Sequence, residues 1–332
     1  TQLQDFLSGF VTGQSDSLAG LGAAVTSDLT VYGDLRDITV EGGKARDSLF
    51  WQMIMPEREL GFQCYLYLTG QGKAGFNLIL WGRERKPHVL ELVQGDVPDG
   101  MDFDDFRLGG LRVRQPADQR TAHVSFESGK VSLDYAFEGV HAPFSYRSNP
   151  DGLPSWFADN RLEQTGWVRG HVAWDGGRVD FDRIGHRDHS WGVRHWQAPQ
   201  HWKWLVAYTP DASRIVNAWI WFAVGEMGVG GYVVRDGELV PIAGLTQKAV
   251  FDDDMKQRSI EVSIADIRGG TCALSMERFG LVKLPTGGRH ATMIMEAACR
   301  ARIDGREAAG QFECQWPQAY LDALIELKAG AA

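Results

Sequence analysis

The most informative stretch of this sequence is Gly185-His186-Arg187-Asp188-His189-Ser190-Trp191-Gly192-Val193-Arg194-His195-Trp196. Its twelve residues combine three histidines, two arginines and one aspartate with two tryptophans, and glycines stand at positions 185 and 192. No other segment of the chain brings together so many titratable groups and so much aromatic surface. Because ordinary sheet and turn sequence surrounds this central stretch, it is the first place to look for a functional site.

The sequence around the central stretch consists of short apolar runs separated by turn residues. From Val124 to Phe137, apolar and polar residues alternate on both sides of a Ser128-Gly129-Lys130 turn, the pattern of an antiparallel hairpin with one solvated face. A second hairpin is predicted from Trp167 to Phe181, with its turn at Asp175-Gly176-Gly177. Further strands are expected at residues 48–55, 61–68, 74–81, 202–208, 215–224, 231–234, 248–251, 260–264, 273–276 and 292–302.

Helical patterning is persuasive only at the C-terminal end. Pro317 precedes a run at 319–327 in which Tyr320, Leu324 and Leu327 share one helical face. Residues 1–30 are rich in Gly, Ala and Ser and predict a short helix or two. Many short strands without interleaved helices indicate an all-β protein of antiparallel barrels or sandwiches, not a parallel sheet with crossover helices.

The length of 332 residues and the number of predicted strands favour two β domains in tandem. We expect one domain at residues 1–185 and the second at 186–332, with the central stretch at their junction. No Pro/Ser-rich linker marks the boundary.

Composition excludes several classes of partner. The chain has 34 Lys+Arg against 43 Asp+Glu, a net charge of −9, and no dense basic run. We therefore expect neither nucleic acid nor an anionic membrane surface as partner, since both require clustered cations. The longest apolar stretch, at 215–224, is too short to span a bilayer. A homo-oligomer is compatible with this sequence.

Cysteine usage and the N-terminus favour a cytoplasmic protein. The four cysteines form no close metal-type pair and predict buried thiols in a reducing compartment: Cys64, Cys272, Cys299 and Cys314. The first residues lack the basic start and apolar run of a signal peptide.

Asp188 is the leading candidate for acid–base chemistry. Neighbouring cations lower the pKa of a carboxyl, whereas burial against Trp191 and Trp196 raises it. Enzymes use such opposed environments to keep one group as proton donor and another as acceptor near neutral pH. The predicted catalytic set is Asp188 as principal acid or base, His189 or His195 as proton partner, Arg187 or Arg194 fixing the carboxylate or a substrate oxygen, and Glu163 as a further carboxylate.

Two other interpretations of the central stretch remain open. Arg187, Asp188 and Arg194 could form buried ion pairs that pin the two domains together. The histidines at 186, 189 and 195 could hold a metal ion, but in an extended strand Asp188 points away from both of its neighbours, which spoils a simple clamp. We therefore predict no metal site.

Tryptophans are concentrated around the same region. Of 12 in the chain, nine fall between Trp156 and Trp221. Residues two apart in a strand share a face, so these rings would suit a cavity for an apolar or aromatic ligand. The alternative is a large aromatic core. The predicted substrate-binding residues are Trp191, Trp196, Trp202, Trp204, Trp219 and Trp221.

A longer pattern carries a resemblance to a known superfamily. It runs Glu163-Gln164-x-Gly166, Gly170, Asp175-Gly176 and then the central stretch. This order resembles the tandem lipocalin-like superfamily of carotenoid 1,2-hydratases (hydroxyneurosporene synthases), AttH-like proteins and fungal Diels–Alderases or cyclases. It is most similar to a bacterial branch with an Arg-Asp-His-Ser-Trp-Gly signature. Hydratases of the superfamily show Asp-His-Asn-Trp-Gly, so Ser190 replaces the asparagine.

The resemblance, which covers roughly residues 160–205, implies two lipocalin-like domains with a pocket near their junction. It places the family's catalytic aspartate at Asp188, which would protonate an alkene or move a proton without a cofactor. We therefore expect a cofactor-independent lyase, hydratase or isomerase acting on a small hydrophobic terpenoid, steroid-like or aromatic molecule. The alternatives are a non-catalytic carrier of a hydrophobic ligand, a cyclase or Diels–Alderase-type pericyclic catalyst, and a purely structural β protein.

Overall fold

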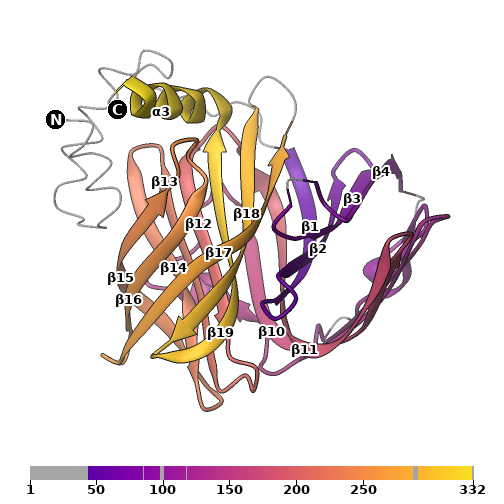
Figure 1. The fold of residues 1–332 in the computed structure, drawn as a ribbon, viewed down its shortest axis with the longest axis horizontal. Coiled ribbons are helices and arrows are strands. Elements are labelled where there is room, and N and C mark those ends of the chain that lie inside the picture. The colour runs from indigo at the N-terminus through magenta and orange to yellow at the C-terminus, as the bar shows by residue number, and fades with distance from the viewer. Residues whose placement is uncertain (1–43, 85, 98–100, 117, 287–290, 331–332) are drawn as a thin grey trace.

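Two antiparallel sheets in tandem make up the protein, followed by one short helix (Figure 1). The computed structural model describes residues 44–84, 86–97, 101–116, 118–286 and 291–330. The helices expected at 1–30 lie outside these residues. The predicted all-β class with two barrel-like domains is confirmed.

The first sheet has 11 strands in the order β4-β3-β2-β1-β11-β10-β8-β7-β6-β5, and β9 pairs with β10. It curves strongly around its own core (Figure 1). Its strands are β1 (Lys44–Met55), β2 (Leu60–Thr69), β3 (Lys73–Trp81), β4 (Val89–Asp96), β5 (Phe106–Leu108), β6 (Leu111–Arg114), β7 (Thr121–Glu127), β8 (Val131–Gly139), β9 (Phe144–Ser145), β10 (Asn160–Trp174) and β11 (Gly177–Arg194).

The second sheet is a closed barrel in simple sequence order. Its strands are β12 (Pro199–Tyr208), β13 (Arg214–Ala223), β14 (Glu226–Arg235), β15 (Glu238–Phe251), β16 (Gln257–Asp266), β17 (Thr271–Pro285), β18 (Thr292–Ile303) and β19 (Arg306–Pro317). The predicted C-terminal helix is confirmed as α3 (Gln318–Gly330), which lies across one end of the barrel and buries Tyr320, Leu321 and Leu324 (Figure 1). None of the helices among the described residues combines the length and apolar character that crossing a bilayer requires.

Both predicted hairpins are present, as β7–β8 and β10–β11. Strand β11 is 18 residues long and runs through most of the central stretch without a break. The two sheets therefore divide between Arg194 and Pro199, later than the predicted join at residues 185 and 186. The reason is that the central stretch continues a strand of the first sheet and does not begin the second domain.

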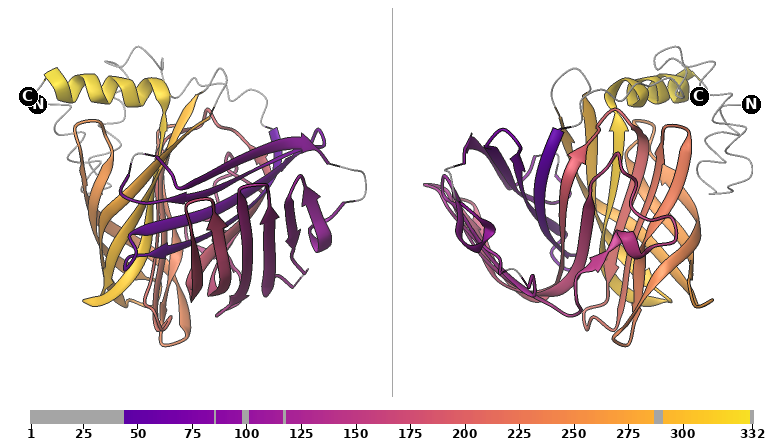
Figure 2. Two further views of the ribbon diagram at one scale, coloured as in Figure 1. Left: turned by 45° about the vertical axis from the view of Figure 1, so that its right-hand side comes forward. Right: turned by 180° about the vertical axis from the view of Figure 1, so that it is seen from behind.

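Three apolar cores hold the protein together. One lies inside the first sheet, one inside the barrel, and the third lies between the two sheets. Strands β1, β2, β3 and β11 of the first sheet pack beside β12, β17, β18 and β19 of the barrel (Figure 2). Along β12, Trp202, Trp204 and Val206 belong to the core between the sheets, whereas Leu205 and Ala207 face the barrel interior. Because successive side chains point to opposite faces of a strand, β12 contributes residues to both cores.

Gly192 allows a neighbouring loop to pack on the end of β11. Its φ is +124°, and an added Cβ would lie 2.3 Å from the backbone nitrogen of Asp159. That nitrogen donates a hydrogen bond of 2.8 Å to the carbonyl of Trp191, and the backbone N–H of His195 donates to the carbonyl of Trp156, also at 2.8 Å. The contacts bring Phe157 into the core between the sheets.

Replacing Gly192 with alanine should therefore destabilise the protein by about 1–3 kcal/mol, because the residue must keep a strained φ while its methyl group displaces the loop. Urea denaturation measures the change. Gly244→Ala is the matched control, since nothing lies within 4 Å of a Cβ at that position. Equal stabilities for the two variants would contradict the requirement for glycine at 192.

Candidate active site

Alternation along β11 divides the central stretch between two faces of the first sheet. Asp188 lies directly opposite Glu163 of β10 and Phe50 of β1, and Phe50 belongs to the core between the sheets. Directly opposed residues share a face, so Asp188 and Glu163 both face the barrel. Arg187 and His189 point the other way, into the first sheet.

Arg161 joins the two carboxylates on the face toward the barrel. Its Nε donates to Oε1 of Glu163 at 2.6 Å, and its Nη2 donates to Oδ2 of Asp188 at 2.9 Å. Nε2 of His186 lies 2.6 Å from Oε2 of Glu163, and its Nδ1 lies 2.9 Å from Oγ1 of Thr165. The side chains of Glu163 and His186 are fully buried, whereas Asp188 keeps 15% of its side chain exposed. Asp188 is thus the accessible end of a buried polar chain.

Burial decides the protonation of these hydrogen-bonded side chains. It raises the pKa of Asp188 to about 6 and that of Glu163 to about 7, and the charge of Arg161 opposes both shifts. Burial lowers the pKa of His186 to about 3, so its ring is neutral near pH 7. Two carboxyls that titrate close to neutrality can both give and take protons under physiological conditions.

Four aromatic rings surround the guanidinium of Arg161. The sequence analysis did not select this arginine. Its Cζ lies within 5.8 Å of the ring centroids of Tyr146, Phe157, Trp204 and Trp219. Such contacts stabilise a cation that has little water around it. The available signal was position, because Arg161 stands two residues before Glu163 in the same strand and so shares its face.

The barrel adds two carboxyl groups to the same interface. Glu313 of β19 lies opposite Trp204 of β12 on one side and opposite Glu296 of β18 on the other. The Trp202 indole N–H donates to Oε1 of Glu313, and the Trp204 indole N–H donates to Oε1 of Glu163 at 3.1 Å. We call Glu163, Asp188, Glu296 and Glu313 the interface carboxyl cluster. Sequence reasoning missed Glu296 and Glu313 because they stand in ordinary strand sequence, far along the chain from the central stretch.

Arg187 and His189 lie away from this cluster. Arg187 donates to Oε1 of Gln164 at 2.8 Å, to Oε1 of Gln115 at 2.5 Å and to the carbonyl of Gln119. Nε2 of His189 lies 2.8 Å from Oδ1 of Asp47. Both side chains therefore belong to the interior and rim of the first sheet.

Arg194 and His195 lie where β11 ends. Arg194 donates to Oγ of Ser190 at 2.9 Å and stacks over Phe157 at 4.1 Å, and its charge helps to oppose the raised pKa of Asp188. Nδ1 of His195 is buried and has no partner among the described residues. Asp188 thus forms its ion pair with Arg161, not with Arg187 or Arg194 as the ion-pair interpretation of the central stretch supposed.

The predicted tryptophans occupy different environments. Trp204 and Trp219 are fully buried, Trp202 and Trp221 nearly so, and Trp191 and Trp196 are half-buried. Trp191 packs on His189 with ring centroids 4.9 Å apart, whereas Trp196 packs on Trp202 at 5.9 Å. Five of the six rings therefore lie toward the interface and form both its aromatic core and part of its rim.

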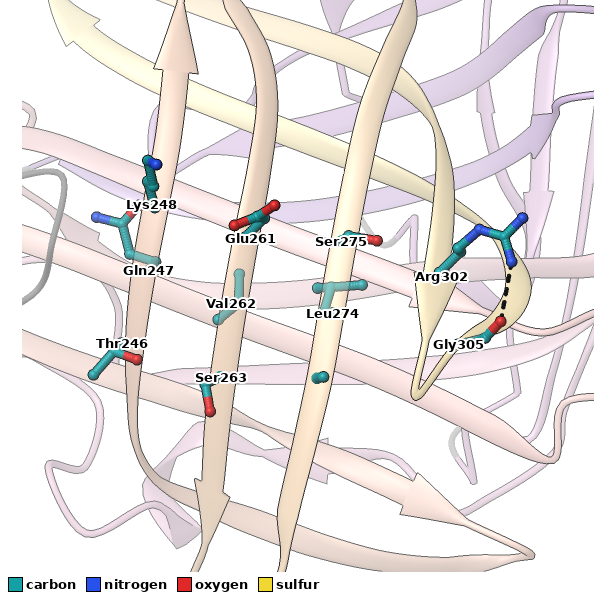
Figure 3. Close-up of a pocket in the computed structure, with 11 residues that line it drawn as sticks. Thr246, Gln247, Lys248, Glu261, Val262, Ser263, Leu274, Ser275, Arg302 and Gly305 are labelled. Atoms are coloured by element: carbon teal, nitrogen blue, oxygen red, sulfur yellow. Dashed lines mark hydrogen bonds between the residues drawn. The ribbon is translucent and has the colours of Figure 1, made fainter.

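A hollow lies on the outer surface of the barrel. It has a volume of about 530 Å³ and is lined from β15 to β18 by polar side chains that include Lys248, Glu261 and Arg302. Figure 3 shows these side chains spread over neighbouring strands, with Arg302 bonded to the carbonyl of Gly305 at 3.1 Å. The hollow contains none of the residues of the interface carboxyl cluster. Within the described ranges, no cluster of three or more His, Cys, Asp or Glu residues is placed to hold a metal ion.

Replacing Arg161 with methionine should destabilise the protein by about 3–5 kcal/mol, because two buried carboxyls lose their shared cation. Chemical denaturation at pH 7 measures the change. Arg178→Met is the control: Arg178 pairs with Asp180 on the solvent side, where both side chains are more than half exposed, and little or no change is expected. A small effect at Arg161 would show that its ion pairs do not support the fold.

Comparison with known proteins identifies the family and the fold. The model of the DUF7064 family, described as a domain of unknown function, matches residues 35–318. No sequence among the curated proteins matches the chain. Among solved structures, the chain is similar to an AttH of Nitrosomonas europaea, with 12% identity, a TM-score of 0.56, and 82% of this chain and 92% of the other covered.

Two further solved structures show the same similarity. Kievitone hydratase of Nectria haematococca is 9% identical with a TM-score of 0.56, and 82% of this chain and 88% of the hydratase are covered. CghA in complex with Sch210972 is 12% identical with a TM-score of 0.54, at 82% and 87% coverage. At these identities the similarity shows the fold alone. The chain belongs to the DUF7064 family and shares its fold with the AttH, kievitone hydratase and CghA structures.

Proposed function

We propose that this protein is a cofactor-independent acid–base enzyme of lyase, hydratase or isomerase type, acting on a small hydrophobic molecule at the interface between its two sheets. The observation that carries the proposal is the state of Asp188. Its carboxyl is partly exposed, pairs with a buried arginine, and has a pKa raised to about 6. A carboxyl in this state is suited to proton transfer near neutral pH.

Burial assigns different roles to the neighbouring side chains. Glu163 is fully buried behind Arg161, so it tunes the charge of Asp188 and does not touch a ligand. Arg194 lies close enough to Asp188 to favour its ionised form. Arg187 and His189 face the opposite side of the sheet, so of the predicted proton partners we retain His195.

The surrounding rings favour an apolar substrate. At the interface Trp202 packs against both Phe157 and Trp196, with ring centroids 5.9 Å apart in each pair. Rigid aromatic walls with a few convergent polar groups are typical of small-molecule sites. A hydratase shares the fold, and another protein with the fold binds Sch210972. Both facts support small-molecule chemistry here, with hydrophobic-ligand transport and pericyclic catalysis as the competing functions.

Asp188→Asn should lower turnover by about a hundredfold or more, because one positioned acid or base contributes about 10²–10⁴ in rate. The change is isosteric and keeps an oxygen acceptor for Arg161, so the fold should persist, as circular dichroism will report. Asp180→Asn is the matched control on the same strand, where the carboxylate is exposed and pairs with Arg178. Normal turnover by the Asp188 variant would contradict the assignment of Asp188 as the acid–base residue.

Incubation with a small-molecule extract of the source organism separates an enzyme from a carrier. Masses of compounds bound to the protein and released from it are compared by mass spectrometry. We expect a product that differs from its precursor by one water or has the same mass and a different retention time. Recovery of an unchanged ligand alone would favour the carrier.

A further inference from the structure

Glu296 and Glu313 form a carboxyl pair on the barrel side of the interface. They lie directly opposite each other in β18 and β19, so their side chains share the face that packs toward the first sheet. Directly opposed residues of an antiparallel pair have Cβ atoms about 4.5–5.5 Å apart, so the two carboxyl groups lie close enough to share a proton. The Gln311 amide donates to Oε2 of Glu296 at 2.6 Å, and the Trp202 indole donates to Oε1 of Glu313.

Two neighbouring carboxyls can bond each other only with a proton between them, since an ionised carboxylate can only accept. Burial raises the pKa of both groups, and that of Glu296 lies well above its usual range because the charge of Glu313 adds to the effect. Arg161 forms ion pairs with Glu163 and Asp188, on the opposite sheet. The interface carboxyl cluster thus holds more acid groups than Arg161 can neutralise, and the pair on the barrel retains a proton.

Exposure distinguishes the two members of the pair. Glu296 is 3% exposed, whereas Glu313 is half-buried, as is Asp188. A partly exposed acidic residue therefore stands on each sheet, Glu313 on the barrel and Asp188 on the first sheet. Gln311 and Gln315 stand two residues to either side of Glu313 and share its face, and their Oε1 atoms have no partner among the described residues. Unsatisfied buried acceptors indicate a place for a bound polar group and not a closed apolar core.

We propose that Glu313, sharing a proton with Glu296, is the proton donor of this site, and that Asp188 is the acceptor across the interface. The proposal rests on the proposed function and refines it by dividing the acid and base roles between the two sheets. Glu296 is a positioning residue, because it acts through Glu313. Asp188 suits the acceptor role because its ion pair with Arg161 favours the ionised form.

The matching substrate is an apolar molecule with a carbon–carbon double bond. The Glu313 carboxyl gives its proton to one alkene carbon, the π electrons form the new C–H bond, and the other carbon becomes a cation. Water then adds its oxygen to the cation and gives a proton to Asp188, which completes a hydration. Alternatively, Asp188 removes a proton from a neighbouring carbon and the C–H electrons form a new double bond, which completes an isomerisation. In both cases the proton on Asp188 returns to the pair through solvent.

The charges that face the pair fix the direction of its pH dependence. Arg161 and Asp188 face it from the first sheet, and their effects on Glu313 oppose each other. In the unfolded chain a glutamate titrates near pH 4.3. At neutral pH the folded pair therefore holds a proton that the unfolded chain has lost, and the contribution of the pair to stability falls as pH rises through this range.

Glu296→Gln tests the shared proton without any substrate. The free energy of unfolding is measured by urea denaturation between pH 6.5 and 8, and its slope gives the protons released on unfolding. We expect Glu296→Gln to release up to one proton fewer than the wild type. Glu226→Gln, at the exposed first residue of β14, should match the wild type. Equal proton release by all three proteins would contradict the claim that Glu296 and Glu313 share a proton.

Turnover variants test the division of roles on a substrate that the wild type converts. Glu313→Gln keeps an acceptor for Trp202 and should lose about a hundredfold or more in rate. Glu296→Gln should keep more activity while the alkaline limb of its pH–rate profile moves to lower pH. Wild-type turnover by Glu313→Gln together with a loss in Asp188→Asn would overturn Glu313 as donor and leave the proposed function standing. Wild-type turnover by Asp188→Asn would overturn the acceptor and the proposed function, whatever the proton-release result.

Discussion

The two ion pairs of Arg161 are the interaction on which the interface depends. One guanidinium, surrounded by aromatic rings, bonds Glu163 at 2.6 Å and Asp188 at 2.9 Å. Removing charges from water is costly, and a buried ion pair offsets that cost only with good geometry and further hydrogen bonds. Here the indole N–H of Trp204 and the ring of His186 supply those bonds to Glu163. Even so, the pKa values of both carboxyls remain raised, so the interface keeps acid groups in a state that can exchange protons.

The fold creates this environment by packing two curved sheets against each other. Each sheet has its own core, and the alternation of β12 and β11 gives each strand a second apolar face that the partner sheet covers. Polar residues on those inner faces meet in a setting that neither sheet alone would provide. The indole N–H of Trp204 connects the two sheets by bonding Glu163 of the first sheet, whereas that of Trp202 bonds Glu313 within the barrel. The tryptophans therefore position acid groups in addition to filling space.

Local sequence patterns were sufficient to predict the main strands and the C-terminal helix of the fold and part of the candidate site. Period-two alternation predicted the β7–β8 and β10–β11 hairpins, and helical periodicity after Pro317 predicted α3. Asp188 and Glu163 were both selected, but proximity in sequence also suggested Arg187 and His189, which the strand turns to its other face. Arg161, Glu296 and Glu313 reach the cluster through pairing between distant strands, and no local pattern reports such contacts. The domain join was misplaced for the same reason, because β11 extends to Arg194.

Four buried carboxyls face the charges of Arg161 and Arg194, so we expect the cluster to hold protons near neutral pH, and this storage is the central property of the site. Carbon-13 NMR of the Asp and Glu side-chain carboxyls, followed as a function of pH, observes it residue by residue. At pH 7 at least one glutamate carboxyl should remain protonated, and its signal should be absent from the spectrum of Glu296→Gln. Titration of every carboxyl with a pKa below about 5, the ordinary range for these side chains, would contradict the storage of a proton at the interface.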